Sequence, residues 1–457
     1  MSTQQPNPPD SAGRAGTLTP LRVAQLDLAG PDGEVLSFGP ALPPAASIEG
    51  GDVYALVRLR GRPVGTVVCR VPPGKCAADA VATEARALLA RTGVPAEHAP
   101  GPAPASADAT PASAPRTSVV VATRERADQL ARALDSLLAQ DHPDFEVVVV
   151  DNAPATDATR DLIAGSYADR GVRYVHEPVP GLAVAHNRGV AAADGEVVAF
   201  TDDDVVADPN WLTALTRPFA TDPGLGCTTG LILPARLGTP AQILLESHGG
   251  FAKGFAPKTY DPHHPPADEP LFPFTAGSFG SGANMAFRAA ALRAAGGFDP
   301  ATGTGTPARG GDDLYAFVRV LTAGHRLRYC PDALVWHHHR ETWRDLENQA
   351  YGYGAGLTAY LTALLVRRPA LLPALLRKLP RGLAHARAIT AHRDSAGAAV
   401  PGAHGAQDHP WPRRLSRLER RGMLAGPVGY VRARRKARGV RPPWEPAGRT
   451  PSEGRQP

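Results

Sequence analysis

The chain has 457 residues with 43% hydrophobic and 20% charged side chains, which excludes both a small disulfide-stapled protein and a chain disordered throughout. Its net charge of +5 is too small for this length to indicate a nucleic-acid partner, and we expect none. The four cysteines form neither a CxxC pair nor a close Cys/His cluster, which argues against a zinc site or disulfide framework and favours a reducing, cytoplasmic compartment. We expect no signal peptide and no transmembrane helix, because no apolar run reaches the roughly 20 residues that a spanning helix needs.

Composition divides the chain into segments. Apolar alternation at 53–59 and 64–71, with a turn between, predicts a β-hairpin, and a helix is expected over 77–90. A Pro/Ala-rich run then predicts a linker, because it cannot bury enough apolar area to become ordered. The expected organisation is a disordered segment (1–20), a small, β-rich α+β N-terminal module (21–93), a Pro/Ala-rich linker (94–116), an α/β domain (117–345), a helical basic C-terminal region (346–440) and a disordered tail (441–457).

Strand and helix patterns alternate after the linker. TSVVVA at 117–122 and FEVVVV at 145–150 are continuous apolar runs, typical of strands buried on both faces. The alternation predicts an open, mostly parallel sheet with flanking helices. Further strands are expected at 172–176 and 196–201, and helices at 130–138, 157–167 and 183–193.

Polar residues end three of these strands, where ligands bind in open α/β sheets. The sequences at the ends are TRER at 123–126, DN at 151–152 and TDDD at 201–204. Neither a Walker-type phosphate loop nor a G-x-G-x-x-G follows the first strand. This absence argues against P-loop NTPases and dinucleotide dehydrogenases.

Asp202, Asp203 and Asp204 place three carboxylates at the end of a buried strand, where their mutual repulsion favours a bound cation. Oxygen ligands without thiolates favour Mg²⁺ or Mn²⁺, shared with water and substrate phosphate. The alternative is a merely solvated loop. Asp208 before Pro209 is more typical of an ordinary helix start.

Seven motifs, in order and spacing, resemble those of a bacterial family 2 glycosyltransferase with the GT-A fold. They span residues 117–340 and read SVVVATRER, EVVVVDNA, GLAVAHNRGVAAADGEVVAFTDDD, GSGANMAFR, GGFD, GGDDLYAFVRV and VWHHH. The resemblance implies that 117–345 is a GT-A catalytic domain. It also implies an inverting, metal-dependent, hexosyltransferase-like enzyme that moves a sugar from a nucleoside diphosphate sugar to an acceptor hydroxyl.

By this resemblance the donor site is assembled from several segments. Thr123, Glu125 and Asp151 correspond to the nucleoside site, with Asp151 accepting a base N–H. Arg124-Glu125 stands where the family usually has Tyr-Asn. The other implied nucleotide-sugar contacts are Asn187, Arg188, Asp202 and Asp203, and the implied metal ligands are Asp202, Asp204 and His337.

Inversion in one step needs a base that deprotonates the acceptor oxygen at a distance from the metal. The sequence GGDD at 310–313 supplies carboxylates for this role. The resemblance makes Asp313 the catalytic base, with Asp312 where Glu is usual. The alternative for Asp313 is the N-cap of the following helix, which would not exclude catalysis.

Three histidines, 337–339, follow a short strand at 333–336. Alternation along an extended chain points His337 and His339 to the same side, and His337 is the expected ligand of the metal or diphosphate, with a solvated turn as the alternative. The glycine-rich segment 277–284 is expected to shape the acceptor pocket. Trp336 and Phe279 are either a platform for a sugar ring or core residues.

The C-terminal region is rich in Leu and Arg. Residues 411–438 contain ten Arg or Lys against one Glu. Basic amphipathic helices lie well on anionic membranes, so we expect peripheral contact with the inner face of the plasma membrane. The alternative is an ordinary helix packed on the catalytic domain with a solvated basic tail.

The expected function is sugar transfer in cell-envelope glycan or glycolipid synthesis, to a glycan, lipid-linked or small-molecule acceptor. Two other functions stay open. One is a nucleotidyltransferase on a similar fold, which would normally carry a Gly-rich, basic loop after the first strand. The other is a non-catalytic sugar-nucleotide-binding module, against which the carboxylates of Asp204 and Asp313 argue. Neither the sugar nor the base follows from the fold.

Overall fold

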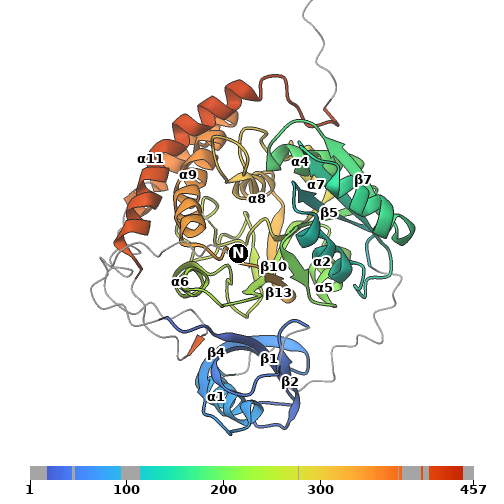
Figure 1. Ribbon diagram of the computed structural model, residues 1–457. Helices are drawn as coiled ribbons and strands as arrows, with labels where there is room; N and C mark the ends of the chain where they lie inside the picture. Colours follow the sequence, from blue (N-terminus) through green and yellow to red (C-terminus); the bar gives the residue numbers. More distant parts are fainter. Residues whose placement is uncertain are drawn as a thin grey trace, which may run out of the picture.

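The computed structural model describes residues 18–43, 47–93, 114–275, 277–378, 380–382, 403–404 and 411–445 (Figure 1). These residues form an N-terminal module, a larger α/β body and a C-terminal helical region. The expected disordered segments 1–20 and 441–457 and the expected linker 94–116 lie mostly outside the described residues.

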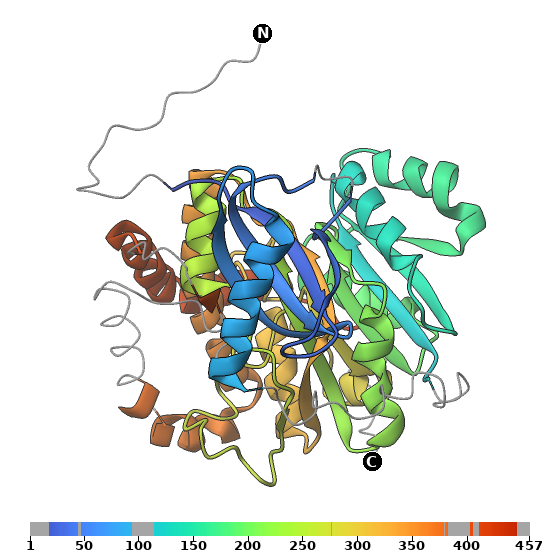
Figure 2. The same cartoon turned by 90° about the horizontal axis from the view of Figure 1, so that it is seen from below.

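The N-terminal module is a sheet with strand order β14-β4-β3-β1-β2, covered by helix α1 (Ala77–Thr92; Figure 2). The predicted hairpin and helix are both present. The pattern did not predict the first two strands, although RVAQLDL buries every second residue from Ala24 to Leu28. The strands are β1 (Arg22–Leu28), β2 (Val35–Pro40), β3 (Gly51–Leu59), β4 (Arg62–Val71) and β14 (Ala403–His404).

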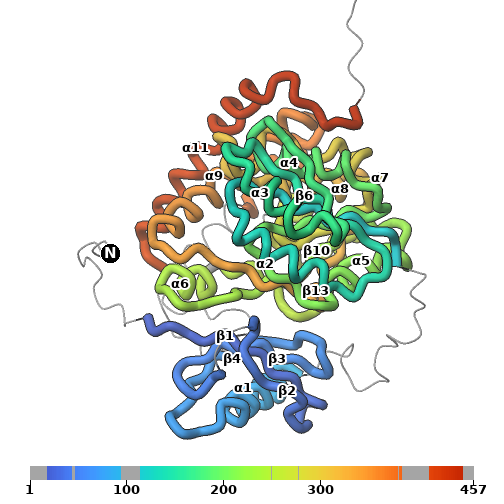
Figure 3. The backbone as a smooth tube through the Cα atoms, turned by 45° about the vertical axis from the view of Figure 1, so that its right-hand side comes forward, coloured from blue at the N-terminus to red at the C-terminus, as the bar shows by residue number. Residues whose placement is uncertain are grey.

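The module is docked on the body beside β13 and α6 (Pro240–Gly249), as Figures 1 and 3 show. Tyr54 of β3 is buried beside Leu237 and Ile243, and Leu56 is buried beside Trp336. Two ion pairs cross the same boundary, Arg58 with Asp208 (2.5 Å) and Arg62 with Asp332 (2.8 Å). Apolar contact and charge pairing together therefore fix the position of the module.

A nine-stranded sheet forms the body, in the order β11-β13-β10-β12-β8-β5-β6-β7, with β9 paired to β13. Strands β8, β5, β6 and β7 are mutually parallel, as are β10 and β13, while β12 runs antiparallel between β8 and β10. The predicted α/β class with a mostly parallel sheet is confirmed. The strands are β5 (Thr117–Thr123), β6 (Phe145–Asn152), β7 (Val172–Glu177), β8 (Val197–Asp202), β9 (Val205–Ala207), β10 (Leu225–Pro234), β11 (Lys258–Tyr260), β12 (Asn284–Arg288) and β13 (Arg326–His337).

Helices cover both faces of this sheet, which explains the uninterrupted apolar runs of its central strands. Along β5, Val119 and Val121 belong to a core cluster with α2 and α5, and Val120 belongs to one with α4 and α8. The helices are α2 (Ala127–Leu137), α3 (Ala158–Leu162) with a π-helical turn (Ile163–Tyr167), α4 (Leu182–Ala192), α5 (Trp211–Thr221), α7 (Ala289–Ala294) and α8 (Asp312–Thr322).

The C-terminal helices α9 (Trp343–Arg367) and α11 (Arg413–Lys436) lie side by side (Figure 1). Glycines permit this contact, since a Cβ on Gly354 would stand 1.9 Å from the carbonyl oxygen of Glu419. No single helix within the described ranges is long and apolar enough to cross a membrane. By length and composition, α9 passes that test only together with Pro369–Lys378, across a bend of 112°.

Candidate active site

The carboxyl ends of β5, β6 and β8 meet at one edge of the sheet. Their register pairs Thr123 with Asp151 and Ala122 with Asp202, so the polar strand ends singled out in the sequence lie beside one another. β9 then pairs with β13 and aligns Val205 with His337. This pairing brings the histidine strand to the acidic triplet.

Asp203 is held by its neighbours within the triplet. The Thr123 hydroxyl donates to its Oδ2 at 2.8 Å, and Arg126 Nη1 donates to its Oδ1 at 2.9 Å. Both carboxylate oxygens are thus occupied, and the side chain is 5% exposed. The prediction that Asp203 and Thr123 contact the nucleotide sugar differs from this geometry, in which the two side chains bind each other.

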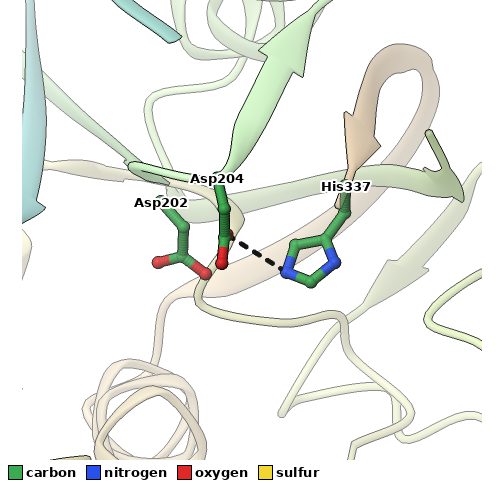
Figure 4. A group of neighbouring side chains, drawn as sticks. All are labelled: Asp202, Asp204 and His337. Atoms are coloured by element: carbon green, nitrogen blue, oxygen red, sulfur yellow. Dashed lines mark ion pairs between the residues drawn. The ribbon is translucent and has the colours of Figure 1, made fainter. Parts of the chain in front are cut away.

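Asp202, Asp204 and His337 point toward a common space (Figure 4). Each offers one ligand atom, and these atoms lie within 4.8 Å of one another. His337 Nε2 is 3.3 Å from Asp204 Oδ1, and Arg340 Nη2 is 3.4 Å from Asp204 Oδ2. These are the three residues predicted as metal ligands, and they come from β8, the following turn and β13.

The electrostatics of this group favour a cation. Burial lowers the pKa of His337 to about 3, so its imidazole is neutral at physiological pH. Burial and the neighbouring charges of Asp204 and Asp203 raise the pKa of Asp202 well above its usual range. Among the described residues, no group meets hydrogen-bond geometry with the buried Asp204 Oδ1, although His337 Nε2 lies 3.3 Å away. Two carboxylates and a neutral imidazole fit Mn²⁺ or Mg²⁺, which would relieve this repulsion.

A second pair of carboxylates opens helix α8. Gly311, with φ +83°, is the N-cap, so Asp312 and Asp313 lie in the first turn, and the alternative that Asp313 itself caps the helix is not realised. The backbone N–H of Gly282 donates to Asp313 Oδ2 at 2.9 Å. Burial and the charge of Asp312 raise the pKa of Asp313 to about 6.

The two acidic centres are neighbours. Gly282, which donates to Asp313, lies two residues before Asn284, and Asn284 pairs with Thr201 of β8, so the α8 carboxylates lie near the β8 edge. Desolvation lowers the pKa of Lys253, although its side chain is solvent-accessible. The charge of Asp313 opposes that lowering.

His186 is a site residue that the sequence did not single out. It is 2% exposed, lies between the rings of Phe200 and Phe298, and places Nδ1 at 3.4 Å from Asp312 Oδ2. Its signal was its position directly before Asn187 in the GLAVAHNRG motif. Arg126 and Arg340 were also not singled out as site residues, although Arg126 is the last residue of the TRER strand end and Arg340 directly follows the three histidines.

The residues predicted for the nucleoside site differ in what they contact. Asp151 is fully buried and accepts from the Tyr174 hydroxyl at 3.0 Å, while its Oδ1 has no hydrogen-bond partner. Glu125 accepts from the backbone N–H groups of Ala155 (2.7 Å) and Thr156 (3.0 Å), so it holds the loop after β6. Among the described residues, none meets hydrogen-bond geometry with Asp151 Oδ1, although the Thr159 side chain helps to lower the pKa of this carboxyl, whereas both oxygens of Glu125 are engaged.

The two residues of α4 that were predicted to contact the nucleotide, Asn187 and Arg188, differ in their surroundings. Asn187 is buried, and its side-chain amide makes two hydrogen bonds to the backbone of Phe298. Its Nδ2 donates to the carbonyl oxygen at 2.8 Å, and its Oδ1 accepts from the N–H at 3.0 Å. It therefore fixes the loop after α7. Arg188 is exposed one residue further along the helix.

The glycine-rich segment 277–284 contacts Asp313 through the backbone N–H of Gly282, and its role in an acceptor pocket stays a prediction. The aromatic platform is wrong. Phe279 is fully buried against Tyr260 and Phe272, and Trp336 is 2% exposed, so neither ring is open to a sugar. Both follow the alternative interpretation as core residues.

Residues 118–293 match the family model described as Glycosyl transferase family 2. A pre-mycofactocin glycosyltransferase from Mycobacterium tuberculosis is 31% identical over 258 residues, 55% of this chain and 48% of that protein. A validoxylamine A glucosyltransferase from Streptomyces hygroscopicus is 39% identical over 125 residues, 25% of this chain and 29% of that protein. The chain thus spans about half, or less, of the curated relatives it matches.

Among solved structures, the chain is similar to a mannosyltransferase from Pyrobaculum calidifontis in complex with GDP-Man and Mn²⁺. The TM-score is 0.41 at 22% sequence identity, over 71% of this chain and 88% of the other.

Proposed function

Since residues 118–293 form a glycosyltransferase family 2 domain, we propose that the protein transfers a sugar from a nucleoside diphosphate sugar to an acceptor hydroxyl, with inversion. The observation that carries the proposal is the pair of unlike acidic centres at the sheet edge. Asp202 and Asp204 share their space with a neutral imidazole, and Asp313 has a raised pKa beside them. Of the three functions that the sequence left open, the family match favours sugar transfer.

The donor side rests on the first centre. Asp202, Asp204 and His337 would hold Mg²⁺ or Mn²⁺, which when bound neutralises the diphosphate leaving group. Arg340, half-buried beside Asp204, is placed to add positive charge there. The unpartnered Oδ1 of Asp151 supplies an acceptor for a base N–H. Together these groups would orient the donor with its anomeric carbon toward α8.

The acceptor side rests on the second centre. As the acceptor oxygen forms its bond to the anomeric carbon, the bond from that carbon to the diphosphate oxygen breaks, and the acceptor proton passes to Asp313. The pKa of about 6 keeps Asp313 ionised at neutral pH yet more basic than an ordinary aspartate. The Gly282 N–H fixes one carboxylate oxygen. Attack on the side opposite the diphosphate gives inversion.

We further propose that the acceptor belongs to cell-envelope glycan or glycolipid synthesis and is met at the inner face of an anionic membrane. Helix α11 exposes Leu424 (82%), Val428 (53%) and Val431 (43%) along one outward stripe. Exposed arginines, among them Arg421 and Arg435, lie at both ends of the stripe. An apolar ridge bounded by cations complements an anionic bilayer surface.

The membrane proposal is tested by co-sedimentation with phosphatidylglycerol and phosphatidylcholine vesicles. Leu424→Ser/Val428→Ser should reduce binding to the anionic vesicles, while the buried face of α11 stays unchanged. Equal binding of this double variant and the wild type, or binding that does not distinguish the two lipids, would contradict the proposal.

A donor screen tests the transferase proposal. The melting temperature is measured with UDP-, GDP- and dTDP-sugars, with and without Mn²⁺. A ligand at 100 times its Kd stabilises the native state by roughly 2.7 kcal/mol, which is enough to raise the melting temperature measurably. Because the metal is proposed to hold the diphosphate, the preferred donor should cause this rise only when Mn²⁺ is present. Asp204→Asn is the matched control. The proposal fails if no nucleoside diphosphate sugar gives a metal-dependent shift.

A further inference from the structure

A continuous line of buried polar contacts joins the N-terminal module to the metal-ligand group. The Tyr54 hydroxyl donates to Glu246 Oε1 at 3.2 Å, and Glu246 Oε2 lies 3.2 Å from His339 Nε2. His339 Nδ1 is 2.9 Å from His337 Nδ1, and His337 Nε2 faces Asp204 at 3.3 Å. All five residues are at most 7% exposed.

The contacts determine which imidazole nitrogens carry protons. An ionised Glu246 accepts only, so His339 must donate from Nε2, and a neutral His339 then has a bare Nδ1. His337 must donate from Nδ1 to this bare nitrogen, which leaves the lone pair of His337 Nε2 directed at Asp204. This is the tautomer that a metal ligand needs.

Packing holds the imidazoles in this arrangement. The ring of Phe251 lies 5.2 Å from the ring of His337 and 5.6 Å from that of His339. The Gln242 side chain donates to the backbone oxygen of His339 at 3.1 Å, and Gln242 is itself fixed by the capping box of α6 with Thr239. The carboxylate of Glu246 accepts hydrogen bonds from two sides: His339 donates to Oε2, and the Tyr54 hydroxyl donates to Oε1. These two donors orient the carboxylate.

We propose that the N-terminal module is a working part of the donor site, in which Tyr54 and Glu246 are positioning residues that hold His337 in its metal-binding tautomer through His339. The proposal rests on the proposed function, because it assumes a cation at Asp202, Asp204 and His337. A histidine that binds a metal through one ring nitrogen commonly donates the N–H of its other ring nitrogen to a neighbouring group. Loss of that neighbouring group weakens metal affinity by roughly 10- to 100-fold.

Tyr54→Phe is the gentlest test, because it removes one hydroxyl and keeps the ring between Leu237 and Ile243. Without that donor, Glu246 is held by His339 alone and the tautomer is no longer fixed. We expect Mn²⁺ affinity, measured by calorimetry in the presence of GDP or UDP on the full chain, to fall about 10-fold. Affinity for the nucleotide without metal should not change.

Arg62→Gln is the matched control. It removes the ion pair between Arg62 of the module and Asp332 of the body, whose side chains are 27% and 28% exposed, respectively. Neither residue belongs to the line of contacts from Tyr54 to Asp204. It should leave Mn²⁺ affinity at the wild-type value. Equal weakening by Arg62→Gln and Tyr54→Phe would mean that docking alone matters, and would overturn the positioning role.

Nitrogen-15 NMR of labelled histidine side chains gives a second readout that a merely structural role would not move. Using His337→Gln to assign the signals, the wild type should show His337 protonated at Nδ1 and bare at Nε2 before metal is added. Tyr54→Phe and Glu246→Leu should both produce mixed tautomers. A wild-type His337 protonated at Nε2, or an unchanged tautomer in both variants, would overturn the proposal.

Mn²⁺ binding distinguishes failure of the proposed metal site from failure of the positioning role of the module. If the wild type binds no Mn²⁺ with either nucleotide, the proposed metal site is wrong. If the wild type binds Mn²⁺ and Tyr54→Phe binds it equally well, the metal site stands and the positioning role of the module is wrong.

Discussion

The two acidic centres of the body differ in the groups that contact their carboxylates. Asp203 and Asp204 meet two guanidinium groups, Arg126 and Arg340, and an imidazole. Asp313 is instead held by two backbone N–H groups, Gly282 on Oδ2 and Leu314 on Oδ1, and another carboxylate, Asp312, raises its pKa. The first centre gathers positive charge and open ligand atoms, whereas the second keeps its negative charge poorly compensated.

This difference in charge surroundings fits the first centre to binding the donor and metal, and the second centre to general-base catalysis. A site that binds a diphosphate and its cation needs charges of both signs, because donor and metal must each find partners. A general base needs a pKa near the working pH, which burial and a like charge provide. Substitutions that exchange or remove these environments therefore test the comparison.

The largest effect is expected at the first centre. Asp204→Asn removes the charge nearest to His337 and Arg340 with little change in shape. Loss of metal-assisted charge neutralisation, worth several kcal/mol, should lower turnover by about 10³-fold. Steady-state assays with Mn²⁺ and the preferred donor would measure it, and an unchanged rate would remove Asp204 from the donor site.

A smaller loss is expected at the second centre. Asp313→Asn should lower single-turnover transfer by roughly 10²-fold, at the lower end of what loss of a general base costs, because the acceptor proton loses its acceptor. The variant retains the α8 turn, and circular dichroism checks that it folds. Transfer at the wild-type rate would move the base elsewhere in the site.

The pH profile should separate Asp313 from Asp312. Transfer needs ionised Asp313, so the rate should rise with pH through about 6 and fall below it. The nearby charge of His186 lowers the pKa of Asp313 and so favours its ionised form, and Lys253 interacts with the same carboxylate. Asp312→Asn removes the like charge that raises the pKa of Asp313, so the acid limb should move to lower pH. A limb that stays in place would exclude this coupling.

The smallest effect is expected for Asp203→Asn. Its two oxygens serve Thr123 and Arg126, so the change weakens a buried contact without removing a proposed metal ligand. The free energy of unfolding should fall by about 1.5–3 kcal/mol, measured by chemical denaturation, while Mn²⁺ affinity falls far less than in Asp204→Asn. Equal losses of metal affinity would make the triplet a single site without division of roles.

The sequence predicted those features that depend on local pattern. Apolar runs ended by TRER, DN and TDDD indicated the sheet and its functional edge, and alternation placed His337 and His339 on one side. Parallel pairing between strands that follow in the chain then brings their ends together without further information.

Features that depend on distant pairing could not be predicted in this way. Nothing local shows that Tyr54 of β3 reaches Glu246 of α6, 192 residues away. Asn187 and Phe279 carry side chains suited to a ligand, but the fold uses both internally, because loops and strands from elsewhere cover them. A residue type and its motif predict which chemistry is available, and tertiary packing decides whether it stays free.

The most direct test of the division between the centres is Mn²⁺-dependent binding of the donor's nucleoside diphosphate, measured by calorimetry in Asp204→Asn and Asp313→Asn side by side. The account predicts that binding is lost in Asp204→Asn and stays near the wild-type value in Asp313→Asn. Retained binding in Asp204→Asn, or an equal loss in Asp313→Asn, would contradict it.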